Sequence, residues 1–309
     1  MKLAGAPISW GVNELPRWGH RMAPQRVLGE MHALGLQATE LGPPGYLPAE
    51  PGALRELLDR AGLSLAAGFL AVVLHDHEHR VEAMAEVRKE AEALAAAGAD
   101  VLVLAAALPG DTYDRHDSLP NEAWTTLTES LAAASEITAA NRLCLALHPH
   151  AGTAIESEQE VTKLLETTDV DICLDTGHLF LGGSDPVAVV LAAGSRVRHV
   201  HLKDVDAAMA ARVRSAELEY AAAVRSGLYR PLGQGDVDIA AVFNRLQGSG
   251  YDGWYVLEQD TALTAEPEPA QGPIVGVRQS LEFFKALYSR AKQPTSPSKE
   301  EESWVVLGR

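Results

Sequence analysis

Side chains that bind metal ions stand directly after short apolar runs in this sequence. Asp175 follows residues 170–174, His201 follows residues 197–200, and Glu258 follows residues 253–257. Carboxylates and imidazoles bind divalent ions such as Mn²⁺, Co²⁺ and Mg²⁺, and Zn²⁺ accepts both groups as well. If these runs are neighbouring parallel strands, their polar ends surround one point in space. We therefore predict a metal-dependent enzyme that acts on a small polyol or sugar.

The segment His148-Pro149-His150 follows another apolar run, 143–147. The two histidines are two residues apart, so in a strand they face the same way. One is a candidate metal ligand and the other a candidate for contact with substrate.

Several of these residues also have interpretations without a metal. Asp175 is a candidate N-cap for the turn that follows it. We expect His201 to face the barrel mouth, and His199 to face the other way as a packed histidine. The run 75–79 is rich in metal-ligand side chains, but a solvated loop and helix start explain it best, with a lid as the alternative.

Four further residues are candidates for substrate binding. Trp10, Asn13 and Glu40 follow the first two apolar runs, and Arg230 follows a helical insertion. An indole offers an apolar face to a sugar ring, although core packing explains Trp10 about as well.

Apolar runs and helical stretches alternate along the chain in eight units, which predicts one α/β domain folded as a (β/α)8 TIM barrel. An open doubly wound sheet is the alternative, but it usually carries a Gly-rich turn after strand 1, which Ser9–Asn13 is not. The expected strands are 3–10, 36–41, 63–70, 101–104, 143–147, 170–174, 197–200 and 253–257. The expected helices are 24–34, 51–61, 78–97, 121–140, 157–167, one opened by Asp185-Pro186, and 273–290.

Two segments depart from this alternation. Residues 207–227 form a helical insertion, which is a candidate lid or substrate wall, or else a surface excursion. Residues 291–309 are polar and rich in Pro and Ser, so we expect a barrel at 1–290 and a short flexible tail at 291–309. The apolar end of the tail, 304–307, is a candidate for docking on a neighbouring subunit in a homo-oligomer.

The overall composition excludes some classes of partner. The formal net charge of −16 argues against nucleic acid or an anionic membrane surface, since both attract basic proteins. Cys144 and Cys173 lie inside apolar runs and are expected to be reduced, buried thiols. We find no signal-peptide pattern and no apolar stretch long enough to span a membrane, so a cytoplasmic location is expected.

The sequence resembles the inosose dehydratase group, which is part of the xylose-isomerase-like superfamily of sugar isomerases, epimerases and dehydratases. The resemblance extends to about residue 290. It rests on Pro7–Gly11, Thr39–Pro43, His148–Thr153, Asp175–His178, His201–Asp204, Gly233–Asp238 and Glu258–Asp260.

This resemblance implies a divalent ion (Mn, Co or Mg, with Zn as an alternative) held by residues on strands 5 to 8. Asp175, His201 and Glu258 match three of the positions. At the fourth, many relatives carry Glu where this sequence has His148, so either His148 is the ligand or Glu156 reaches in from the loop.

The expected reaction is dehydration of a keto-polyol such as an inosose. A base removes the proton next to a metal-polarised ketone, and the β-hydroxyl then leaves. His150, Glu156 and His178 are candidate bases. Lys203 is a candidate for holding charge on the intermediate, with a structural salt bridge to Asp204 or another carboxylate as the alternative. A ketose isomerase or epimerase and a keto-glycoside lyase remain open because they share the first step; a non-catalytic sugar-binding barrel is the non-enzyme alternative.

Overall fold

The computed structural model describes residues 1–309 except 14, 16, 111–113, 115–116 and 293–309. Eight parallel strands close into a barrel in the order β1-β10-β7-β6-β5-β4-β3-β2, as the TIM-barrel prediction requires. The barrel strands are β1 (Lys2–Gly5), β2 (Ala38–Glu40), β3 (Ser64–Val72), β4 (Val101–Ala106), β5 (Cys144–Leu147), β6 (Ile172–Asp175), β7 (Val197–Leu202) and β10 (Trp254–Leu257).

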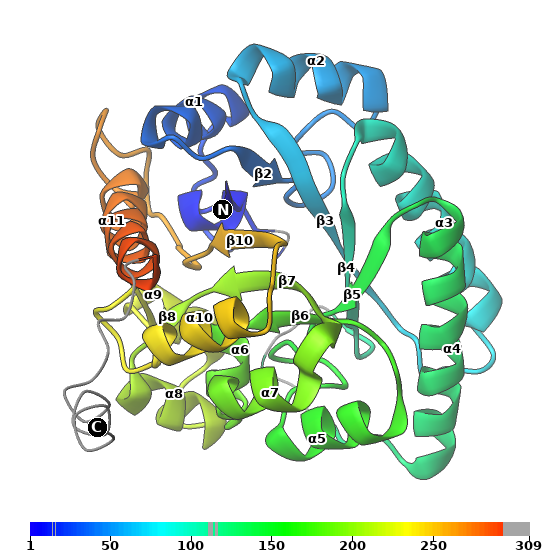
Figure 1. Cartoon of the computed structure of the whole chain (residues 1–309). Coiled ribbons are helices and arrows are strands. Elements are labelled where there is room, and N and C mark those ends of the chain that lie inside the picture. The colour runs from blue at the N-terminus through cyan, green and yellow to red at the C-terminus, as the bar shows by residue number, and fades with distance from the viewer. Residues whose placement is uncertain (14, 16, 111–113, 115–116, 293–309) are drawn as a thin grey trace, which may run out of the picture.

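Helices lie outside the strands (Figure 1). The helices between and after the barrel strands are α1 (Pro24–Leu34), α2 (Pro51–Ala61), α3 (Arg80–Ala97), α4 (Asn121–Ala140), α5 (Glu158–Thr167), α6 (Thr176–Leu181), α7 (Pro186–Ala193), α10 (Ile239–Gly248) and α11 (Pro273–Ala291). Three of the α-helices end at a glycine in the left-handed helical conformation: Gly35, Gly62 and Gly98. This left-handed backbone stops a helix at little cost only in glycine, which is why the sequence marks these ends so clearly.

Small side chains fill the part of the barrel interior that lies away from the mouth. On β4, Val103 belongs to a separate small cluster with Ala146 and Cys173, whereas Leu102 and Leu104 belong to the main core cluster. This alternation follows the two-residue period of a strand, with one face inside the barrel and the other against the helices. Cys173 faces inward, so Asp175, two residues further along β6, also faces inward at the mouth.

The structure corrects some boundaries. The first strand was expected at 3–10, but β1 ends at Gly5 and a 3-10 helix, η1 (Pro7–Trp10), follows. Proline has no N–H group to donate to a neighbouring strand, which is one physical reason why the strand stops there. The other strands differ from expectation by a few residues at their ends. The expected capping box at Ser157 and Glu160 is present.

Both cysteines are free thiols, as expected; Cys173 is fully buried, whereas Cys144 is only partly buried, which differs from expectation. Across the described residues, no helix combines the length and apolar character that crossing a membrane requires. The expected flexible tail falls, from residue 293 on, outside the described residues.

The insertion is built on a short antiparallel ribbon of β8 (Asp204–Val205) and β9 (Tyr229–Arg230). It carries the helices α8 (Ala207–Arg214) and α9 (Tyr220–Arg225). The fully buried carboxylate of Asp204 holds the next loop, because its two oxygens accept hydrogen bonds from the backbone N–H groups of Gly233, Gly235 and Val237 at 2.8–3.0 Å.

Candidate metal centre and active site

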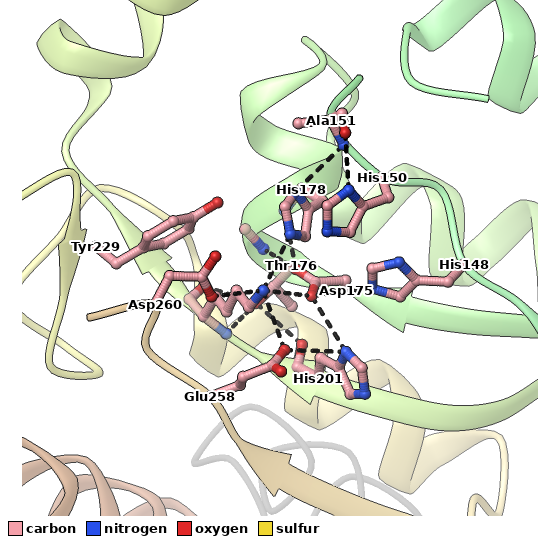
Figure 2. A network of polar contacts seen from close by, with 12 residues as sticks. His148, His150, Ala151, Asp175, Thr176, His178, His201, Tyr229, Glu258 and Asp260 are labelled. Atoms are coloured by element: carbon pink, nitrogen blue, oxygen red, sulfur yellow. Dashed lines mark hydrogen bonds and ion pairs between the residues drawn. The ribbon is translucent and has the colours of Figure 1, made fainter. Parts of the chain in front are cut away.

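Three side chains from three neighbouring strands converge at the mouth of the barrel. Asp175 ends β6, His201 lies on β7, and Glu258 directly follows β10 (Figure 2). Their ligand atoms lie within 4.8 Å of one another. Nδ1 of His201 is 3.3 Å from Oδ2 of Asp175 and 3.0 Å from Oε2 of Glu258. The strand ends therefore bring together the three firmest ligand candidates.

Asp175 serves two purposes at once. Its Oδ1 accepts hydrogen bonds from the backbone N–H groups of Gly177 and His178, both at 2.8 Å, and so caps α6. Its Oδ2 points to the cluster at the mouth. The cap and the metal-ligand interpretations of Asp175 are thus compatible, because each uses a different oxygen.

Glu40 reaches the cluster from β2. Its Oε1 accepts hydrogen bonds from Nε2 of His199 at 2.7 Å and from Nε2 of His201 at 2.9 Å. The expectation that His199 faces away from His201 is therefore wrong. Residues two apart on a strand point to the same face, so both histidines face into the barrel.

The donor atoms of this cluster suit a cation between them. A neutral His201 that donates from Nε2 to Glu40 has its lone pair on Nδ1. That lone pair faces the carboxylates of Asp175 and Glu258. His201 Nδ1 and Glu258 Oε2 are buried, and neither atom makes a hydrogen bond with any described residue. A proton on Nδ1 or a metal ion removes this repulsion. Burial lowers the pKa of His201, but the carboxylates of Glu258 and Glu40 beside it hold that pKa well above its usual range.

Lys203 carries a buried ammonium group beside the same carboxylates. Its Nζ lies 3.3 Å from Asp175 Oδ2, 3.0 Å from Glu258 Oε2 and 2.9 Å from Asp260 Oδ1. Burial lowers the pKa of Lys203, but these three carboxylates raise it well above the usual value, so the group is charged. Lys203 therefore pairs with neighbouring carboxylates rather than with Asp204, whose oxygens bind backbone N–H groups.

Three histidines stand together on the β5 and β6 side of the mouth. His148 Nε2 is 3.2 Å from Asp175 Oδ2. The rings of His150 and His178 lie 3.8 Å apart, centroid to centroid. Burial and neighbouring positive groups lower the pKa of both well below the usual value, so both rings are neutral at pH 7. His178 Nε2 also lies 3.0 Å from Lys203 Nζ.

A cavity of about 300 Å³ opens beside these groups. This volume is at the lower end of the range for small-molecule sites. One side of it is polar and is formed by Glu40, His148, His150, His201, Lys203, Glu258 and Asp260. The facing side is mostly apolar and includes Pro7, Ile8, Val12, Pro43, Pro44, Phe69 and Leu70.

Of the remaining residues predicted to bind substrate, one lines the cavity and two do not. Asn13 lines the cavity, and its Oδ1 accepts a hydrogen bond from the N–H of Leu15. Trp10 is fully buried and its indole donates to Glu30 at 2.8 Å, which is the core-packing interpretation. Arg230 pairs with Asp206 at 3.1 Å. Within the described part of the chain, neither Trp10 nor Arg230 lines the cavity.

Glu156 is not part of the ligand cluster formed by the described residues. Its Oε2 accepts a hydrogen bond from the N–H of Gly152 at 2.7 Å, which fixes the loop after His150. Of the two candidates for the fourth ligand position, His148 is the one in contact with Asp175.

Tyr220, Tyr229 and Asp260 belong to the site but were not among the predicted site residues. The Tyr220 hydroxyl donates to Asp260 Oδ2 at 2.6 Å and lies 3.0 Å from the Tyr229 hydroxyl. The insertion thus supplies a buried side chain that supports Asp260. Asp260 shares the strand-end position and parity of Glu258, which is a signal that could have identified it; Tyr220 has no comparable signal.

Comparisons with known proteins agree with this architecture. The family model described as xylose isomerase-like TIM barrel matches residues 28–287. The inosose dehydratase of Geobacillus kaustophilus (strain HTA426) is 32% identical over 294 residues, covering 91% of this chain and 93% of that protein. The rhizopine catabolism protein MocC of Rhizobium meliloti is 32% identical over 283 residues, covering 88% of this chain and 83% of that protein.

Solved structures share the fold at lower identity. The structure of L-ribulose 3-epimerase superposes with a TM-score of 0.69 at 14% identity and covers 97% of this chain and 100% of its own. The IOLI protein with a bound zinc atom superposes with a TM-score of 0.68 at 16% identity and covers 94% of this chain and 99% of its own.

Proposed function

Because the chain belongs to the xylose isomerase-like TIM barrel family, we propose that it is a metal-dependent dehydratase that acts on a keto-polyol such as an inosose. The convergence of Asp175, His201 and Glu258 at the barrel mouth carries this proposal. The inosose dehydratases that match it over most of their length support the choice of reaction and of substrate.

The residues present fit a divalent metal ion. The buried Nδ1 of His201 and the carboxylates of Asp175 and Glu258 face one another, and their ligand atoms lie close enough together to bind one ion. These three would hold the ion, and His148 is the candidate for a fourth ligand. When bound, the metal polarises the ketone of the substrate and so acidifies the neighbouring C–H bond.

His150 is the base that the geometry favours. Its Nδ1 is 2.8 Å from the carbonyl oxygen of Ala151, so Nδ1 carries the proton and Nε2 carries the lone pair. The ring is neutral at pH 7, because burial lowers its pKa. It also lines the cavity, so a substrate bound there is within its reach.

Lys203 supplies positive charge beside the leaving hydroxyl. Its ammonium lines the cavity and is held by Asp260 and Glu258 at 2.9 and 3.0 Å. A hydrogen bond from the ammonium to the hydroxyl oxygen stabilises the negative charge that develops there as the C–O bond breaks. The proton that converts the departing hydroxide to water comes from the imidazolium that His150 becomes when it takes the C–H proton.

The test is a mass measurement on products. The protein is freed of metal with a chelator, reloaded with Mn²⁺, Co²⁺, Mg²⁺ or Zn²⁺ in separate samples, and incubated with scyllo-inosose, a panel of ketoses and a 3-keto-glucoside. We expect loss of one water from the inosose, and no turnover in the metal-free sample.

The same experiment distinguishes the other reactions that begin with the same proton abstraction. A product of unchanged mass from a ketose would replace the dehydratase with an isomerase or epimerase. Release of an aglycone without loss of water from the inosose would make the protein a keto-glycoside lyase. Metal binding with no turnover of any substrate would favour a sugar-binding barrel.

A further inference from the structure

We infer that Glu40 is a positioning residue that fixes the tautomer of His201 and thereby selects Nδ1 of His201 as the metal-binding atom. The inference rests on the metal centre of the proposed function. It also gives Glu40 a role different from the one expected from sequence, which was contact with substrate.

The contact that fixes the tautomer runs across the barrel. Glu40 ends β2, whereas His199 and His201 lie on β7, and β10 and β1 separate these strands in the barrel order. The pairing of β2 with β3 is irregular between Thr39 and Glu40. Ala38, two residues before Glu40, packs in a small cluster with Ala4 and Val256 inside the barrel, so Glu40 also faces inward and its carboxylate points across the interior to β7.

The direction of the hydrogen bonds decides which nitrogen is left for a metal. An ionised carboxylate can only accept, so the Nε2 atoms that contact Oε1 of Glu40 both carry protons. A single oxygen, Oε1 of Glu40, lies 2.7 Å from Nε2 of His199 and 2.9 Å from Nε2 of His201, which is the arrangement of one acceptor between two donors. A neutral His201 with its proton on Nε2 offers Nδ1, the atom that faces Asp175 and Glu258.

The two histidines differ in what their second nitrogen meets. His201 Nδ1 lies against two carboxylates. His199 Nδ1 is buried and makes no hydrogen bond with any described residue. The same acceptor therefore fixes both rings, but only His201 presents its lone pair to a cluster of anionic groups. His199 is a second anchor for Glu40 rather than a ligand.

The test compares zinc affinity in variants of the full chain. Glu40→Met removes the acceptor at similar length, and we expect its zinc affinity to fall about 10- to 100-fold, which is typical when the outer partner of a ligand is lost. Glu40→Gln keeps an oxygen that can accept the same two bonds, so its affinity falls less. Glu56→Met, the same substitution at an exposed glutamate on α2, is the matched control and keeps the wild-type affinity.

A nuclear magnetic resonance measurement reports on the tautomer directly. In zinc-loaded protein with ¹⁵N-labelled histidine, we expect the proton of His201 on Nε2, protected from exchange, and zinc on Nδ1. Glu40→Met loses that protection, whereas a merely structural role for Glu40 would leave it unchanged. If Glu40→Met does not fold, the wild-type tautomer and the Glu40→Gln affinity decide.

Zinc on Nε2 of His201 would overturn the inference. Unchanged zinc affinity in a folded Glu40→Met variant would overturn it too. If the KM of that variant were raised at the same time, Glu40 would return to substrate binding. Wild-type protein that binds no divalent ion would overturn the proposed function as well, so the two failures are distinguishable.

Discussion

The two sides of the barrel mouth differ in chemistry. The side formed by β5, β6, β7 and β10 carries histidines, carboxylates and one lysine, nearly all buried. The facing side, formed by the ends of β1, β2 and β3, carries Pro7, Ile8, Pro43 and Phe69. A polyol ring has hydroxyl groups for the first side and C–H groups for the second. The difference indicates that one side performs the reaction and the other holds the carbon skeleton.

Glu40 is the exception to this division. It belongs to β2, on the apolar side, yet its carboxylate binds two histidines of the polar side. Substitutions on each side should therefore give different kinetic signatures: loss of kcat on the polar side, and a raised KM on the apolar side.

Asp175→Asn should have the largest effect. The amide keeps an oxygen for the N–H groups of Gly177 and His178, so the cap of α6 survives, but the negative charge is lost. We expect kcat/KM to fall about 10³-fold, because a metal supplies several kcal/mol of charge stabilisation. Bound metal, measured after dialysis, should fall with it. Asp185→Asn is the control, since Asp185 caps α7 at an exposed position, and an equal loss there would remove the special role of Asp175.

His150→Asn should separate proton transfer from metal binding. The amide N–H can replace Nδ1 in its contact with the carbonyl of Ala151, but it provides no base. We expect kcat to fall about 10²-fold with zinc affinity unchanged. An exposed histidine, His79, provides the control variant His79→Asn. Unchanged kcat in His150→Asn would assign the base to another group, with His178 next in position.

Phe69→Ala should affect the apolar side only. The ring lies about 6 Å from those of His148 and His150, measured between centroids. Loss of its apolar area is expected to raise KM about 10-fold and to leave kcat and zinc affinity nearly unchanged. Phe69→Leu should lie between wild type and Ala. A fall in kcat without a rise in KM would mean that the apolar side positions the histidines rather than the substrate.

The sequence predicts the barrel well because each strand is a short apolar run and several helices end at glycine. It also predicts Asp175, His201 and Glu258, since each comes directly after a run that ends at the mouth. It fails at Trp10, because the strand stops at Gly5 and the 3-10 turn that follows directs the indole to Glu30 instead of the cavity.

Contacts between distant parts of the chain cannot be predicted from the local sequence pattern. Glu40 and His201 are 161 residues apart, and their contact depends on barrel closure, which brings the ends of β2 and β7 to the same mouth. Tyr220 enters the site from an insertion whose length and direction no periodicity specifies. Of the two kinds of partner considered for Lys203, Asp204 or another carboxylate, Asp204 is a neighbour in sequence only, because adjacent strand residues point to opposite faces.

Asp204 and Gly235 also constrain how this protein can be redesigned. A Cβ atom at Gly235 would lie 2.3 Å from Oδ1 of Asp204, so no other residue fits there while the carboxylate remains in place. The two positions can therefore only be changed together, although they are 31 positions apart in the sequence. His201 and Lys203 can be transplanted to another barrel without Asp204. In that case the loop that contains Gly233 and Gly235 must be left out as well, because Asp204 holds it.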